Sequence, residues 1–198
     1  MKKINKNTPP FLSKFIKKNK PKDWKELTPE TKTELGEYIL KEQRNQCAYC
    51  ECYIKQYKSN FHIDHFKTRN LFPQLTFDYN NLFLSCTSKD NCASYKDKSH
   101  LQKKDFDKLI HPAFDNPEDS FSYLASGAIY PKNPNDVKAI FTIEKFNLQS
   151  KKLVHRRRTI AIKLSNNHYK SIDSEIIIKE FKEYESFIKY IKTIINRQ

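Results

Sequence analysis

Two pairs of cysteines, far apart in the sequence, restrict the fold of this 198-residue chain more than any other feature. Cys47 and Cys50 form a CxxC pair, and Cys86 and Cys92 form a second pair with five residues between them. Such an arrangement is typical of a tetrahedral structural zinc site, because each close pair supplies one knuckle and the metal closes the loop between them. Cys52 is an alternative to Cys50 as a ligand. A CxxC pair makes the better knuckle, however, and we interpret Cys52 as a free thiol.

Two other interpretations of the cysteines are weaker. Five buried core cysteines within one 46-residue span of a 198-residue chain would be unusual. A redox-active CxxC pair would require a βαβ pattern around it, and the sequence has none there. Zinc would supply folding energy that this glycine-poor, charge-rich segment cannot obtain from its own core.

The charge of the chain predicts a polyanionic partner. Lys and Arg number 37 and Asp and Glu number 23, which gives a net charge of +14 and a pI near 9.5. Nucleic acid is therefore the first expectation and an anionic membrane surface the second. The mean hydropathy of −0.83 excludes an integral membrane protein, and the N-terminal sequence has no secretory signal pattern, so we expect a cytoplasmic protein. With two glycines the chain cannot form a Gly-rich phosphate loop, which argues against its being a nucleotide-binding ATPase itself.

The chain divides into four predicted parts. They are a basic N-terminal arm (1–22) with eight lysines and no acidic residue, a helix with the cysteine-stapled core (23–110), a hairpin and helical extension with a basic run (111–165), and a C-terminal amphipathic helix (166–198). Hydrophobic spacing and turn residues predict a helix over 29–45, strands over 61–66 and 81–85, a helix from Cys92, and a hairpin around Gly127. An apolar stripe from Ile177 to Ile195 predicts one long helix, which we expect to pack within the chain.

The predicted strand 61–66 carries an adjacent acid and base. Asp64 is able to hold a hard divalent cation through oxygen, and such a cation would polarise a phosphodiester. Neutral His65 is able to take a proton from an attacking water. We interpret His62, on the same strand, as structural, and we expect Lys96 to face phosphate or solvent. The run Arg156–Arg158 is either a solvated face or a nucleic-acid contact.

Five elements in order resemble the HNH endonucleases. They are Cys47-x-x-Cys50, Ile63-Asp64-His65-Phe66, Asn80-Asn81-Leu82, Cys86, and Cys92-x-x-x-Lys96. The resemblance implies an α+β fold, with a small zinc-stapled ββα-metal core flanked by helices at both ends. It implies that His65 is the general base, that Asp64 binds a catalytic Mg²⁺ or Mn²⁺, and that Asn81 braces the loop between the strands. Cys47, Cys50, Cys86 and Cys92 would hold the structural zinc.

A longer resemblance, up to about residue 165, is to the HNH subunits of Septu anti-phage defence systems, which also occur as effectors of some retrons. It rests on Glu42-Gln43, His111-Pro112, the turn at Gly127, Phe146-Asn147-Leu148, and Leu153 with the arginines after it. It implies a nuclease that works with an ABC/SMC-type ATPase subunit. DNA is the favoured substrate, and RNA, including tRNA, is the alternative.

One position departs from the HNH pattern. The family helix usually offers a second metal ligand directly after its last cysteine, and here that residue is Ala93. Asp97 and His100, one and two turns further on, or Asn91 before the helix, are possible substitutes. The same departure keeps open a rival function, a zinc-stapled nucleic-acid-binding module without catalysis.

The two ends of the chain are the expected docking elements for the ATPase. In the N-terminal arm, prolines surround four large apolar residues: Phe11, Leu12, Phe15 and Ile16. Such an arm is expected to become ordered only against another surface. The competing interpretation assigns its lysines to nucleic acid.

Overall fold

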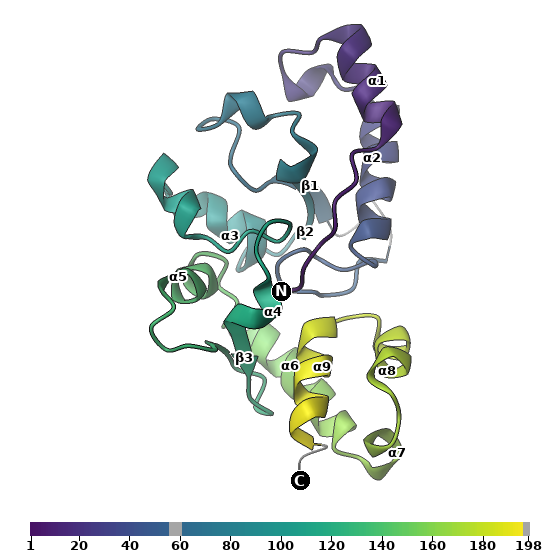
Figure 1. The fold of residues 1–198 in the computed structure, drawn as a ribbon, viewed down its shortest axis with the longest axis vertical. Coiled ribbons are helices and arrows are strands. Elements are labelled where there is room, and N and C mark those ends of the chain that lie inside the picture. The colour runs from purple at the N-terminus through teal and green to yellow at the C-terminus, as the bar shows by residue number, and fades with distance from the viewer. Residues whose placement is uncertain (56–60, 196–198) are drawn as a thin grey trace.

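A computed structural model describes residues 1–55 and 61–195, and it has an α+β fold with two separate two-stranded antiparallel sheets (Figure 1). The upper part in Figure 1 holds the first helices and the sheet β1–β2, and the lower part holds the C-terminal helices. None of the helices in the described ranges is both long and apolar enough to cross a membrane. The elements are α1 Pro10–Asn19, η1 Trp24–Glu26, α2 Pro29–Glu42, β1 Phe61–His65, η2 Pro73–Leu75, η3 Tyr79–Asn81, β2 Leu82–Cys86, α3 Cys92–Lys98, η4 Lys103–Lys108, α4 Pro117–Ser120, β3 Phe121–Tyr123, β4 Ile129–Pro131, α5 Val137–Lys145, α6 Lys151–Leu164, α7 Asn167–Lys170, α8 Ser174–Phe181 and α9 Glu185–Ile195.

The sheet β1–β2 is the scaffold of the upper part. Its register pairs Asp64 with Phe83 and His65 with Leu82. Strand β2 is buried along its whole length, and α2 and α3 both pack on it. Both predicted strands and the helix that begins at Cys92 are thus confirmed.

The predicted helix 29–45 ends three residues early, at Glu42. Arg44 and Asn45 have φ angles of 52° and 57°, a left-handed conformation that stops an α-helix. Gln43, between the helix and this turn, is fully buried, and its amide binds both the N–H (2.8 Å) and the C=O (3.0 Å) of Leu84. The turn therefore directs the chain from α2 onto the edge of β2 and towards Cys47.

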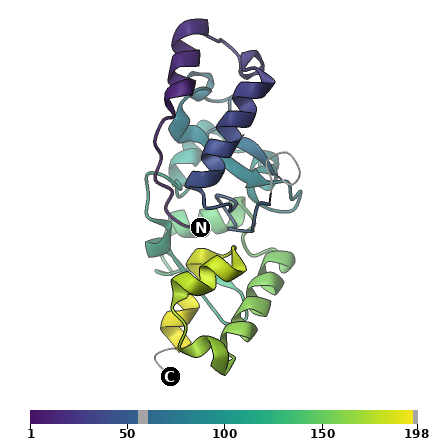
Figure 2. The same ribbon diagram turned by 90° about the vertical axis from the view of Figure 1, so that its right-hand side faces the viewer.

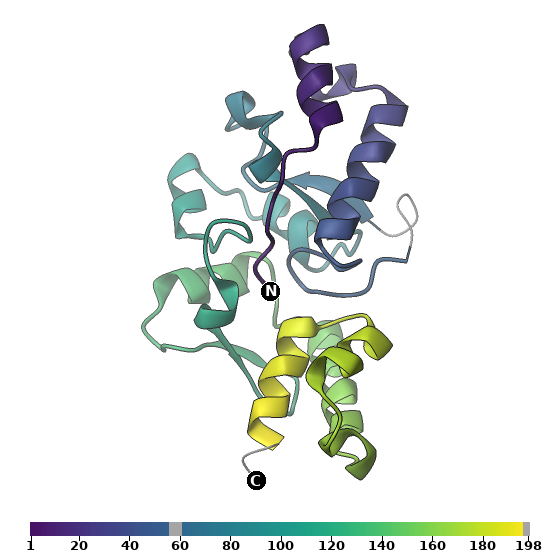
Figure 3. The same cartoon turned by 45° about the vertical axis from the view of Figure 1, so that its right-hand side comes forward.

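The first nine residues pack against the chain itself (Figure 3). The N–H of Ile4 donates to the C=O of Pro112 at 2.8 Å, and the side chain of Ile4 is buried. Lys2 pairs with Glu185 at 2.6 Å, and Lys6 pairs with Glu42 at 3.2 Å. The first half of the arm is therefore ordered by contacts with the rest of the same chain. Docking of the arm on a separate subunit stays a prediction.

The described part of the C-terminal segment, 166–195, forms three helices, α7, α8 and α9, so the prediction of one long helix is wrong. Lys182 and Tyr184 have φ angles of 61° and 54°, which separates α8 from α9 (Figure 2). Tyr184 is buried, and its N–H donates to the C=O of Glu51 at 2.8 Å. The break thus lets an aromatic side chain reach the body of the protein. The apolar stripe does pack within the chain, as expected, and residues 196–198 lie outside the described part.

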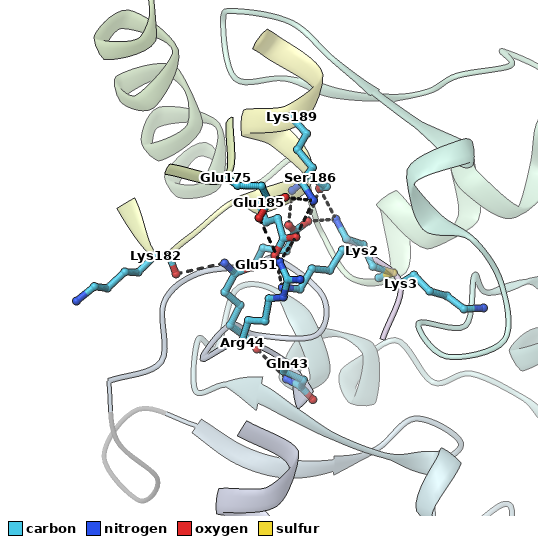
Figure 4. A network of polar contacts seen from close by, with 12 residues as sticks. Lys2, Lys3, Gln43, Arg44, Glu51, Glu175, Lys182, Glu185, Ser186 and Lys189 are labelled. Atoms are coloured by element: carbon cyan, nitrogen blue, oxygen red, sulfur yellow. Dashed lines mark hydrogen bonds and ion pairs between the residues drawn. The ribbon is translucent and has the colours of Figure 1, made fainter. Parts of the chain in front are cut away.

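A polar network joins α9 to the N-terminal residues and to the end of α2 (Figure 4). The carboxylate of Glu185 pairs with Lys2, Arg44 and Lys189. Burial alone would raise the pKa of Glu185, but bonds to Lys2 and Lys189 outweigh it and hold that pKa below its usual value. Glu51, which is also buried, accepts from the N–H of Ser186 at 2.7 Å. These charges fix the C-terminal helices to the cysteine-bearing core.

The basic run on α6 is only partly a surface. Arg157 is buried, and it donates to the C=O of Gly127 (2.6 Å) and of Leu148 (2.8 Å). Gly127 has a φ of 87°, and a Cβ there would lie 2.1 Å from the C=O oxygen of Val154. The interpretation of Arg156–Arg158 as one exposed face is therefore wrong for Arg157, which fastens the β3–β4 turn to α6.

His111 predicts a pH dependence of stability. Its ring packs edge-on against Phe66, and its Nδ1 accepts from the N–H groups of Ala113 (3.1 Å) and Phe114 (3.2 Å). Burial lowers the pKa of His111 to about 4; the charge of Asp115 opposes this shift, and those of Lys3, Lys67 and Lys138 add to it. Because the unfolded chain takes up the proton near pH 6.5, stability should fall as the pH drops from 6.5 to 4, by about 3 kcal/mol for this group.

The measurement is urea unfolding between pH 7 and pH 4, with His111→Gln as the matched variant. Its amide oxygen can accept the same N–H bonds, and it does not titrate. The variant should lose less stability across this range than the wild type, and equal pH slopes for both proteins would contradict the prediction.

Candidate functional site

Five thiols gather around Cys86, the last residue of β2. The Sγ atoms of Cys47, Cys50, Cys52 and Cys86 all lie within 4.8 Å of one another. The Sγ of Cys92 lies 3.8 Å from that of Cys47, and the Sγ of Cys50 lies 3.9 Å from that of Cys86. Four sulfurs around one zinc ion, each about 2.3 Å from it, are about 3.8 Å apart. The sulfur donors and the distances between them therefore fit a structural zinc site.

The predicted ligand set and the tightest group of sulfurs differ in one member. Both include Cys47, Cys50 and Cys86. The sequence favours Cys92 as the fourth ligand, whereas the tightest group holds Cys52. The Sγ of Cys92 lies 3.8 Å from that of Cys47, which is the separation expected of two sulfurs on one zinc ion. We keep Cys92 as the prediction on that ground.

The local electrostatics favour a thiolate at Cys47. Burial alone would raise its pKa, but hydrogen bonds from the neighbouring thiols outweigh it and hold that pKa well below its usual value. The N–H of Cys86 also points at the Sγ of Cys47, at 3.3 Å. A cysteine binds a metal ion as the thiolate, so the lowered pKa of Cys47 favours metal binding at this position.

Asp64 and Lys96 form a buried ion pair. Lys96 is 1% exposed and Asp64 is 4% exposed. The Nζ of Lys96 lies 3.1 Å and 2.9 Å from the two carboxylate oxygens of Asp64, and it also donates to the C=O groups of His65 (2.9 Å) and Phe66 (3.1 Å). The hydroxyl of Tyr49 donates to the same carboxylate. The expectation that Lys96 faces phosphate or solvent is therefore wrong.

His65 is held by backbone and aromatic contacts. Its Nε2 lies 3.0 Å from the C=O of Thr76, and its ring meets that of Trp24 edge-on at 4.6 Å. Burial lowers the pKa of His65 to about 4, and the bond to Thr76 only partly offsets this. A neutral imidazole that donates through Nε2 keeps a lone pair on Nδ1, which is the state that a general base needs.

Asn81 ends η3, directly before β2, and fastens the loop that follows β1. Its Oδ1 accepts from the N–H of Lys67 at 2.7 Å, and its Nδ2 donates to the C=O of Lys67 (3.0 Å) and of Leu75 (3.2 Å). All the polar atoms of its side chain are used within the loop. This side chain thus fixes the segment between His65 and Thr76, which is the bracing that the family resemblance implies for it.

A polar cavity of about 520 Å³ opens beside Asp64 and His65. Of the three residues named as substitutes for Ala93, Asp97 and His100 line this cavity, and so does His62. Asn91 lies instead at the cysteines, where its Oδ1 is 3.6 Å from the Sγ of Cys86. The titratable and charged side chains that line the cavity are His62, Asp64, His65, Arg69, Lys96, Asp97 and His100.

These side chains do not form a ready cation site. In residues 1–55 and 61–195, the only group of three or more His, Cys, Asp or Glu side chains close enough to share an ion is that of the cysteines. The carboxylate of Asp64 is already bonded by Lys96 and Tyr49. The arrangement therefore does not fit a catalytic cation at Asp64 unless Lys96 withdraws.

Sequence reasoning missed the partners of the acid–base pair. Tyr49 lies inside the first CxxC pair, and Lys96 lies one helical turn after Cys92, so both positions were visible as parts of the motif. Trp24 and the C=O of Thr76 gave no local signal, because their contacts with His65 join segments that are distant in sequence.

The chain is similar to "Septu protein PtuB" of Bacillus thuringiensis, with 28% identity over 129 residues. The match covers 63% of this chain and 45% of that protein, so the chain aligns with less than half of its relative. No protein-family model matches the chain. The comparison supports a relationship to a Septu defence component.

Proposed function

We propose that this chain is an HNH-type endonuclease that cleaves nucleic acid as a component of a Septu-type anti-phage defence system. The observation that carries the proposal is the neutral His65, held by Thr76 beside a polar cavity, on a β-hairpin that a thiol cluster fastens to the following helix. The similarity to a Septu protein supports the same assignment. DNA is the favoured substrate and RNA or tRNA, as in a retron effector, the alternative. The action would be cytoplasmic, where free thiols stay reduced.

His65 would act as the general base. Its bond to Thr76 places the proton on Nε2, so Nδ1 is free to take a proton from the water that attacks phosphorus. Asn81 and Trp24 would keep the imidazole in place, and Arg69 on the cavity wall would attract the phosphodiester. The structural zinc supplies folding energy when it is bound by the thiols.

The family resemblance also implies a catalytic Mg²⁺ or Mn²⁺ at Asp64. Because Lys96 and Tyr49 occupy that carboxylate, we derive no step through such an ion. In this structure the basic side chains on the cavity wall with His65 are Arg69 and Lys96, and Lys96 is paired with Asp64.

Replacing His65 with alanine should lower the cleavage rate by about a hundredfold or more. The fold and the zinc content should survive, because the thiols and Asn81 are untouched. The measurement is cleavage of labelled DNA and RNA, with zinc by elemental analysis and circular dichroism on the same samples. His62→Ala is the matched control, since His62 lines the same cavity without an assigned role.

Cleavage by His65→Ala at the wild-type rate would contradict the assignment. Running the assay with added Mg²⁺, with Mn²⁺ and with a chelator that spares the zinc separates a catalytic ion from the structural one.

The buried Asp64–Lys96 pair favours a second function, a zinc-stapled binding module without catalysis. In that case the protein would bind nucleic acid and leave it intact under every metal condition. An ABC/SMC-type ATPase partner belongs to the proposal in both cases, and co-purification with it is the test.

A further inference from the structure

Helix α1 displays a stripe of lysines on its outer side. Lys14, Lys17 and Lys18 have i, i+3, i+4 spacing, so they share one helical face, and all three are exposed. Leu12, on the opposite face, is fully buried, and Phe15 is half-buried. The apolar residues of the arm therefore attach α1 to the protein and turn its lysines outward.

The stripe continues beyond the helix. Lys20, Lys22 and Lys25 are exposed as well, and they lead along the chain from α1 into η1. None of the ion pairs in the described residues involves any of these six lysines, which we call the lysine stripe. The two carboxylates within this segment, Asp23 and Glu26, cap η1 by accepting from backbone N–H groups. The segment thus carries a clear excess of positive charge.

Trp24 connects the lysine stripe to the candidate site. It lies between Lys22 and Lys25, and its ring meets that of His65 at 4.6 Å and stacks with Phe77 at 6.2 Å. The end of the stripe is therefore fixed directly beside the imidazole. A polyanion that follows the stripe would arrive at His65.

We propose that the lysine stripe binds the phosphate backbone of a single nucleic-acid strand and guides it to His65. The proposal deepens the proposed function, on which it rests, and it assigns the N-terminal arm to the substrate instead of the ATPase. A positive track next to an aromatic residue is the usual design of a surface for single strands. The ten residues of α1 span about 15 Å, enough for a few nucleotides.

The other basic surface, on α6, is less suited to this role. Arg157 is buried in backbone contacts, and Arg156 is paired with Glu183 at 3.0 Å. Lys151, Lys152 and Lys163 remain exposed there, and they provide a control of equal charge.

The experiment uses full-length protein with His65→Ala, so that cleavage does not disturb the binding measurement. One variant adds Lys14→Gln, Lys17→Gln and Lys18→Gln, and the control adds Lys151→Gln, Lys152→Gln and Lys163→Gln. Binding of a labelled 20-nucleotide single strand, as DNA and as RNA, is measured by fluorescence anisotropy between 50 and 200 mM salt. The α1 variant should bind about tenfold or more weakly at 100 mM salt, and the slope of log K against log salt should shrink by about 2, since each lost phosphate contact removes about 0.7.

An unchanged slope in the α1 variant, or an equal loss in the α6 control, would overturn the proposal. So would intact binding together with lost co-purification with the ATPase, which would make α1 a partner-docking helix. Failure of the nuclease assignment would look different. The single strand would still bind through the α1 lysines in a salt-dependent way, but the wild-type protein would cleave nothing.

Discussion

Cys47→Ser is expected to abolish metal binding and to unfold the protein. Cys47 belongs to both possible ligand sets, and its sulfur lies within 4.8 Å of the other four. Structural zinc contributes about 10–16 kcal/mol in zinc-finger peptides, which matches or exceeds the whole stability of a typical domain. Elemental analysis of the wild type should give one zinc per chain, and Cys47→Ser should give none, with loss of the circular dichroism signal and of cooperative unfolding.

The fourth ligand is decided by a matched pair of variants. If Cys92 binds the ion, Cys52→Ser should keep the full zinc content and Cys92→Ser should lose it. The reverse pattern would assign the site to Cys52, in line with the tightest group of sulfurs. Cobalt substitution provides a second readout, because the thiolate absorption bands report the number of sulfur ligands. Wild-type protein that folds without any metal would contradict the site altogether.

Local patterns predicted the part of the fold that carries the site. The strand pair and the helix after the last knuckle follow from apolar alternation in 61–66, from the apolar run in 81–85 that leads into Cys86, and from the cysteine spacing. The α+β class follows from the family resemblance. These signals are short-range, since each lies within one element and its nearest turn. The clustering of the thiols was accessible as well, because a knuckle has a fixed sequence spacing.

Long-range packing explains what the sequence did not reveal. The helix ending at Glu42 and the break at Tyr184 both depend on bonds to distant segments, Leu84 and Glu51. Burial of Lys96 depends on the convergence of α3 with the loop after β1. From the sequence a lysine is expected to be exposed, because most lysines are. The contact of Lys96 with Asp64, which permits its burial, is visible only in the three-dimensional structure.

Lys96→Met is expected to destabilise the protein by about 3–5 kcal/mol, as is typical when one partner of a buried ion pair is removed. The substitution leaves the buried carboxylate of Asp64 with Tyr49 alone, and it also removes the donor to the C=O groups of His65 and Phe66. The measurement is urea unfolding at pH 7. Lys98→Met, at an exposed position on the same helix, is the control, and its stability should stay within about 0.5 kcal/mol of the wild type.

The double variant Asp64→Asn, Lys96→Met tests whether the stability lost in Lys96→Met comes from the unpaired, buried carboxylate of Asp64. Removing both charges should recover part of the lost stability, because an amide can be buried with one hydrogen bond far more cheaply than a carboxylate. A double variant as unstable as the sum of the two single ones would show that Asp64 and Lys96 act independently.

The same proteins report on metal binding at Asp64. If Lys96→Met gains affinity for Mn²⁺ and the double variant does not, Lys96 blocks metal binding by the carboxylate of Asp64. If neither binds Mn²⁺, Asp64 is not a metal ligand.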